Sequence, residues 1–120
     1  MSDQKMATAT LLIDNGQVRV TRFDFAPEAQ TGWHRHEHDY VITAISDLKM
    51  RLEEPGGEQR EVSIPAGEAY FRNEGVEHNV INIEDRPISF VEVELKRRRE
   101  FRFLTNAGLQ IAAAPRDKSR

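Results

Sequence analysis

The chain has 120 residues, which is long enough for one modest hydrophobic core and too short for two, so we expect a single domain. Hydrophobic residues make up 38% and charged residues 31%, and no window approaches the roughly 18 uninterrupted apolar residues of a membrane span, which excludes a disordered chain and a membrane partner. The net charge is −3 and cysteine is absent, which excludes disulfides, thiolate nucleophiles and cysteine-based zinc sites.

Short runs with strand character begin near the N-terminus. The first residues, MSDQKMATATLL, lack a basic region followed by a long apolar run, so we expect a cytoplasmic protein. Residues 1–14 should form an arm ending in a strand, and the Asn15-Gly16 pair after it predicts a hairpin. In the next run, QVRVTRFDF, the apolar positions change face between Val20 and Phe23, which predicts a bulge there.

Further strand-like runs continue to residue 95. They are GWHRH, YVITAIS, LKMRLEE, QREVSI, EAYF, HNVINI and ISFVEVEL, with turns at 55–57, 65–67 and 85–87. No segment before residue 96 keeps a 3.6-residue apolar period without proline or glycine. Alternating strands with turns about every eight to twelve residues indicate an all-β domain over residues 15–95, built as a sandwich, jelly roll or small barrel.

Residues 96–120 form a basic C-terminal extension. They hold eight basic and two acidic residues, a net charge of +6, which leaves nine basic and eighteen acidic residues, a net charge of −9, in residues 1–95. An acidic body argues against nucleic acid as a partner. The run REFRFLTNAGLQIAAA could be a final strand, a short helix or an arm packed on a partner, and its apolar residues need cover. Together with the opposite charges of the two parts, this predicts a homodimer.

The stretch TGWHRHEHDY, residues 31–40, holds three of the four histidines. In a strand, residues i and i+2 share a face about 6.5 to 7 Å apart, so two imidazoles can converge on one metal at bond lengths of about 2 Å. His34 and His36 therefore form a competent pair of ligands. A third histidine on the same straight strand would lie about 13 Å from the first, so His38 reaches the same metal only if the chain turns. Trp33 is expected to pack in the core or at its rim.

A turn near residues 37–39 would let the next strand present one more ligand. Asp39 is the first candidate, because two histidines and a carboxylate form a facial set that leaves open positions on Fe(II)-like metals. His38 would complete an all-nitrogen set instead. Tyr40 could supply a phenolate or a hydrogen bond to a bound molecule, and the three alternatives stay open.

The segment PAGEAYFRNEGVEHNVIN, residues 65–82, supplies the fourth histidine. His78 starts a strand and Asn82 shares its face. With the H-x-H pair of His34 and His36, the P-x-G turn at 65–67 and the H-x-x-x-N spacing, the chain resembles a cupin. The resemblance covers residues 15–95 and implies a double-stranded β-helix, a jelly-roll barrel, followed by a C-terminal tail. It implies His78 as a ligand, and we expect Asn82 to be structural.

The cupin resemblance also carries the functional prediction. Metal ligands would be His34, His36 and His78, and Asp39 would stand for the glutamate that the family pattern has and this sequence lacks. The chain is most similar to short single-domain bacterial cupins, some of them linked to β-alanine degradation. The resemblance to these cupins predicts a metal-dependent enzyme that acts on a small polar metabolite. The reaction would be dioxygenase-like, or that of a lyase or isomerase with Tyr40 as acid or base. Fe(II) is favoured, with zinc, manganese or nickel possible. The alternatives are a non-catalytic module that binds or senses a small molecule, and a site used only for folding.

Overall fold

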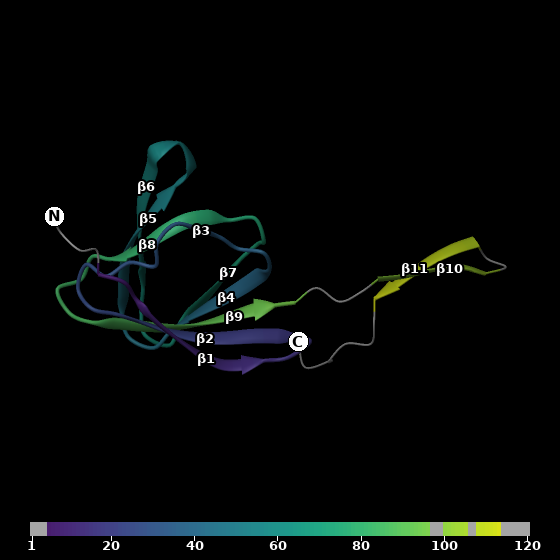
Figure 1. Cartoon of the computed structure of the whole chain (residues 1–120), viewed down its shortest axis with the longest axis horizontal. Coiled ribbons are helices and arrows are strands. Elements are labelled where there is room, and N and C mark those ends of the chain that lie inside the picture. Colours follow the sequence, from purple (N-terminus) through teal and green to yellow (C-terminus); the bar gives the residue numbers. More distant parts are fainter. Residues whose placement is uncertain (1–4, 97–99, 106–107, 114–120) are drawn as a thin grey trace.

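The computed structural model describes residues 5–96, 100–105 and 108–113 (Figure 1). Its strands are β1 (Thr8–Asp14), β2 (Val18–Phe25), β3 (His34–Arg35), β4 (Asp39–Ala44), β5 (Leu48–Glu54), β6 (Glu58–Ile64), β7 (Ala69–Arg72), β8 (Glu77–Asn82), β9 (Ile88–Leu95), β10 (Glu100–Thr105) and β11 (Gly108–Ala113). A short 3-10 helix, η1 (Pro55–Gly57), joins β5 to β6. Within the described residues, no helix is long and apolar enough to cross a membrane.

Two antiparallel sheets enclose the core. One has the order β1-β2-β9-β4-β7 and the other β3-β8-β5-β6, and together they form the double-stranded β-helix that the sequence predicts. Strict alternation places the inward side chains: in β4 and β5, every second residue is buried. Buried apolar side chains come from both sheets, including Phe25, Leu52 and Ile88. Trp33 is not in this core, because its side chain is 54% exposed, which leaves it at the rim.

The β1–β2 hairpin turns at Asn15, as predicted. The Asn15 side-chain Oδ1 accepts hydrogen bonds from the backbone N–H groups of Gln17 at 2.8 Å and Val18 at 2.9 Å. The predicted bulge in β2 is wrong, because β2 pairs with β9 without interruption. The irregularity lies in the partner strand, between Leu11 and Ile13 of β1. An edge strand accommodates an extra residue more easily than a strand hydrogen-bonded on both sides.

Asn82 holds the end of β8 in place, and its expected structural role is confirmed. Its side chain has no exposed surface. The Nδ2 group donates to the carbonyl oxygens of Ala26 at 3.1 Å and Arg86 at 3.0 Å, while Oδ1 accepts from the Glu84 backbone N–H at 2.8 Å. One amide thus ties together two loops that would otherwise leave buried carbonyls unpaired.

The C-terminal extension contains an antiparallel hairpin, in which Glu100 of β10 pairs with Ala113 of β11. The strand alternative is therefore confirmed for these residues. Figure 1 shows the hairpin beyond the barrel sheets. The side chains of residues 97–120 lie outside the described part of the structure. The expectation that another surface covers their apolar groups therefore stays a prediction.

Candidate metal centre

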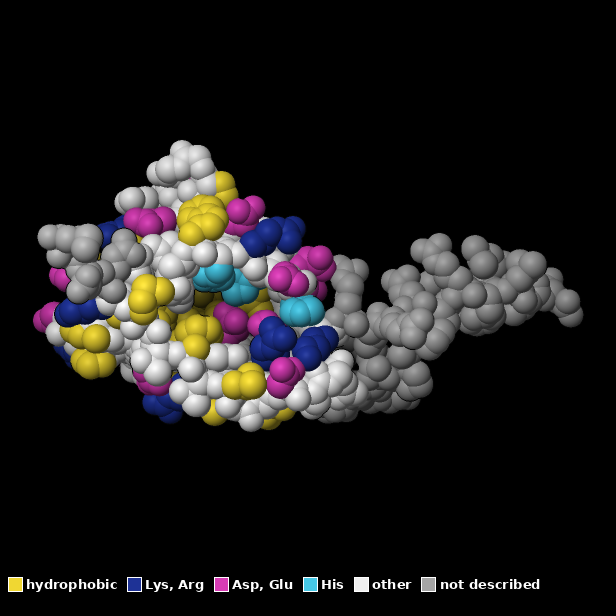
Figure 2. Space-filling view, in the orientation of Figure 1, with side chains coloured by type: hydrophobic (Ala, Val, Ile, Leu, Met, Phe, Trp, Pro, Cys, Tyr) yellow, Lys and Arg dark blue, Asp and Glu magenta, His cyan; other side chains and the backbone are white. Residues whose placement is uncertain are grey.

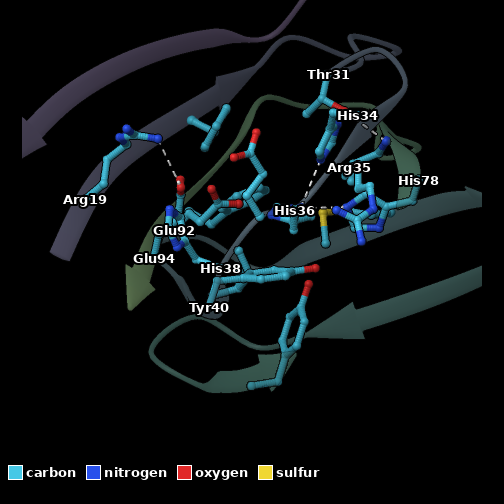
Figure 3. Close-up of a pocket in the computed structure, with 17 residues that line it drawn as sticks. Arg19, Thr31, His34, Arg35, His36, His38, Tyr40, His78, Glu92 and Glu94 are labelled. Atoms are coloured by element: carbon cyan, nitrogen blue, oxygen red, sulfur yellow. Dashed lines mark hydrogen bonds and ion pairs between the residues drawn. The ribbon is translucent and has the colours of Figure 1, made fainter. Parts of the chain in front are cut away.

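Three histidines meet because two strands pair in register. The short strand β3 runs antiparallel to β8, which sets His34 directly opposite His78. His36 follows β3, where its backbone N–H donates to the Val76 carbonyl and its carbonyl accepts from the Gly75 N–H, both at 2.8 Å. Figure 3 shows the three imidazoles turned towards one another. They are the group of His, Asp and Glu side chains in the described structure with ligand atoms close enough to share a metal ion.

The spacing of the ring nitrogens fits a single metal ion. The His36 Nε2 atom lies 3.0 Å from His34 Nε2 and 3.1 Å from His78 Nε2. Two nitrogens bound at about 2.1 Å would lie about 3.0 Å apart at a right angle and about 3.4 Å apart at a tetrahedral angle. Both distances therefore match pairs of ligands at about a right angle on one metal ion, and all three ligand atoms lie within 4.8 Å of one another.

The hydrogen bond of His34 to the backbone indicates which of its ring nitrogens faces the other two histidines. Its Nδ1 lies 2.8 Å from the carbonyl oxygen of Gly32, and a carbonyl only accepts, so Nδ1 carries the proton and Nε2 presents a lone pair. Gly32 adopts a φ of +86°, which favours glycine and turns its carbonyl towards the ring. A neutral His36 has one N–H to share between two neighbouring Nε2 atoms, so at least one pair of lone pairs would face each other without a metal.

Burial keeps two of the imidazoles neutral. It lowers the pKa of His36 to about 4, with a further contribution from the charge of His34. It lowers the pKa of His78 to about 3, with His34 and His36 adding to the effect. The buried Nδ1 of His78 has no hydrogen-bond partner among the described residues. Both rings are therefore neutral imidazoles at neutral pH, and the neutral imidazole is the form that binds metal.

The histidines line one wall of a cavity of about 430 Å³. Apolar side chains from both sheets form much of the remaining wall, including Phe23, Met50, Val80 and Phe90. Figure 2 shows the histidines at the side of this hollow, with acidic and hydrophobic side chains deeper inside it. A cavity of this size suits a small molecule that lies beside the metal.

Tyr40 lies in the cavity and supports His36. The two rings are stacked, with centroids 3.8 Å apart and an angle of 15° between their planes. The buried Tyr40 hydroxyl has no hydrogen-bond partner in the described residues. Burial raises the pKa of this phenol far above its usual value, so the group stays protonated and offers a donor. A phenolate ligand is disfavoured, while the acid or base role of Tyr40 stays a prediction.

The structure does not bring Asp39 to the histidines. Tyr40 points into the barrel, so alternation along β4 turns Asp39 to the other face, where its Oδ1 accepts from the Glu74 backbone N–H at 2.8 Å. His38 is half-buried and lines the cavity, but it is not a member of the three-histidine group. The described geometry gives Asp39 no support as a ligand. The side chains that could share a metal ion in the described structure are those of the three histidines.

Glu92 is a site residue that the sequence reasoning missed. It lies in β9 on the inward face that also carries Ile88 and Phe90, and its side chain is only 8% exposed. Burial raises its pKa to about 7, the charge of Glu94 adds to the rise, and Arg19 opposes it. The signal was present in the run ISFVEVEL, where a glutamate continues the buried alternation of two apolar residues.

The comparisons with known proteins agree with this geometry. No protein-family profile matches the chain. It is 49% identical over 96 residues to the beta-alanine degradation protein BauB of Pseudomonas aeruginosa, which covers 80% of this chain and 100% of that protein. A cupin domain from Bordetella pertussis shares 43% identity at a TM-score of 0.76, covering 80% of this chain and 99% of that one. An RmlC-like cupin from Methanocaldococcus jannaschii, with a double-stranded β-helix fold, shares the fold at 17% identity and a TM-score of 0.64, covering 80% and 85% of the two chains. The chain belongs to the cupin superfamily.

Proposed function

We propose that this cupin is a metal-dependent enzyme that acts on a small polar metabolite. The observation that carries the proposal is the convergence of His34, His36 and His78 through their Nε2 atoms at the wall of a cavity. Three protein ligands would leave the remaining coordination positions of the ion open to water or substrate.

The metal would be held by three neutral nitrogen ligands. Such a set leaves the full positive charge of the ion for an incoming anionic group, so carboxylates or similar oxygen donors are the ligands of choice. When bound, the metal supplies Lewis-acid activation or, as Fe(II), binding and activation of O₂. Fe(II) is the first choice for the dioxygenase-like reaction, and zinc, manganese or nickel would suit a lyase or isomerase.

The protein side chains contribute position and proton supply. The stacked Tyr40 ring fixes the plane of His36, and the Gly32 carbonyl fixes that of His34. The protonated Tyr40 hydroxyl can donate a hydrogen bond to an oxygen of a bound molecule.

The experiment is a turnover assay with defined metal content. Protein purified without an affinity tag is stripped and reloaded with Fe(II), Mn(II), Ni(II) or Zn(II), and each form is offered a metabolite panel that includes β-alanine and its deaminated products, because the Pseudomonas relative is named for β-alanine degradation. O₂ uptake and products are followed by mass spectrometry. Conversion that disappears in His78→Ala supports the enzyme, whereas saturable binding without conversion supports the binding module. Metal content unchanged by the joint replacement of His34 and His78 would refute the metal site.

We also propose that two copies pair. The edge strand β1 exposes Leu11, Leu12 and Ile13 by about half of their surface, and an exposed apolar edge is a surface that proteins normally cover. The acidic body and the basic C-terminal extension have opposite charges, which favours contact between copies. Light scattering after size-exclusion chromatography should give twice the chain mass, and Leu12→Ser should shift it towards one chain mass. A single-chain mass for the unaltered protein would refute the pairing.

A further inference from the structure

The wall of the cavity opposite the histidines carries a buried carboxyl group. Glu92 lies in β9, between β2 and β4 in the middle of the five-stranded sheet, so its position is set by hydrogen bonds on both sides. Figure 3 shows Glu92 and Glu94 near Arg19, on the side of the cavity away from His78. The cavity thus has a metal-binding side and a carboxyl side.

Glu92 has no partner within the described structure. Its neighbour Glu94 is paired with the Arg19 guanidinium at 3.4 Å, but Glu92 makes no hydrogen bond or ion pair with any described residue. Glu92 is only 8% exposed, but its carboxyl oxygens are not among the fully buried polar atoms that lack a partner, so the group reaches the cavity that it lines. A carboxyl group that lines a cavity without an ion pair is a candidate for binding a ligand.

The charges around the carboxyl group favour a cationic ligand. Arg19 is paired with Glu94. The charged side chains that line the cavity are Arg19 and Arg35 against Glu37, Glu92 and Glu94, so with these carboxyl groups ionised and histidine counted as neutral the lining has a formal charge of −1. The groups that face Glu92 from β4 and β7 are the phenols of Tyr40 and Tyr70, which stay neutral because burial raises the pKa of both. A direct metal-ligand role has less support, because the Glu92 oxygens are not among the ligand atoms that gather around the histidines.

We propose that Glu92 binds the ammonium group of a small molecule whose anionic group binds the metal held by His34, His36 and His78. The inference rests on the proposed metal site for one end of the molecule, and it adds the substrate class, a compact amino acid with separated amino and acid groups. A cavity of about 430 Å³ has ample room for such a molecule.

Calorimetric titration of the Zn(II)-loaded protein with isosteric pairs tests the proposal. The pairs are 3-aminopropanoate against butyrate and 4-aminobutyrate against pentanoate, which differ only in an ammonium or a methyl group. At pH 8 at least one amino acid should bind about tenfold or more tightly than its isostere, because a charge-assisted hydrogen bond forms in a buried site. Glu92→Gln should reduce the preference to about twofold or less. Glu61→Gln, an exposed β6 position outside the cavity, is the matched control and should keep it.

Two further measurements separate the possible failures. Metal stoichiometry of Glu92→Gln should equal that of the unaltered protein, and a loss like that of His78→Ala would make Glu92 a metal ligand and overturn the proposal. The metal-free protein is also titrated with propylamine, whose weak binding should disappear in Glu92→Gln. If the metal does not bind but propylamine recognition depends on Glu92, the proposed function fails while the ammonium site stands. Equal binding within each pair in the unaltered protein, or a preference that survives Glu92→Gln, overturns the inference alone.

Discussion

Replacing Glu92 by glutamine should stabilise the metal-free protein, and the gain should grow with pH. The native state raises the pKa of this carboxyl group from an ordinary 4.5 to about 7, mainly through burial. Between these values the native state holds a proton that the unfolded chain has lost, so stability falls as pH rises through this window. Glutamine removes the titration while keeping the size of the side chain.

The magnitude follows from the two pKa values. Each unit of difference corresponds to about 1.4 kcal/mol, so the full effect is on the order of 3 kcal/mol, and about 2 to 3 kcal/mol of it develops between pH 5 and pH 8.5. The side chain is only 8% exposed, so solvent screening reduces this little.

The assay is urea unfolding in the presence of a chelator, repeated at half-unit steps from pH 5 to pH 8.5. Subtracting the unfolding free energy of the unaltered protein from that of Glu92→Gln cancels the contributions of the titrating groups that both proteins share. Glu61→Gln, at an exposed position of β6, is the control for replacing a glutamate by glutamine outside the cavity. A pH-independent difference for Glu92→Gln would show that the carboxyl group is already ionised in the native state over this pH range, and it would refute the raised pKa of Glu92.

The remaining predictions concern the histidines and the residues that hold them. Because burial lowers the pKa of His36 to about 4 and of His78 to about 3, the native metal-free protein binds fewer protons than the unfolded chain, and it should lose stability as pH falls below about 6.5. In urea unfolding, His78→Gln should reduce that slope by about 1.4 kcal/mol per pH unit, and an unchanged slope would contradict the assignment. Asn82→Ala should lower the free energy of unfolding by about 2 kcal/mol, since it removes the side-chain partner of three partly buried backbone groups, and a loss below about 1 kcal/mol would show that the amide is dispensable. Gly32→Ala should weaken zinc binding in competition with a chelator, because its φ of +86° strains an alanine and shifts the carbonyl that orients His34, whereas Gly16→Ala, in an open turn, should bind zinc normally.

Much of this site could be read directly from local patterns. Period-two alternation and turn residues predict the strands, because they depend on neighbours a few positions away. The i and i+2 spacing of His34 and His36 predicts a shared face, and the motif resemblance adds His78 and the structural Asn82. Each of these inferences needs only the geometry of a single strand or a family pattern.

Tertiary structure decided which side chains the barrel encloses. Asp39 and Tyr40 are adjacent, and only the packing of β4 against the opposite sheet determines that the phenol faces the histidines and the carboxylate faces away. In the sequence, Glu92 is one of two glutamates near the end of a predicted strand. It is buried, with a raised pKa, because β9 lies between β2 and β4 in the middle of the sheet. Alternation determines that neighbours face opposite ways, but the choice of the inward face, and the desolvation that follows from it, comes from long-range pairing of strands.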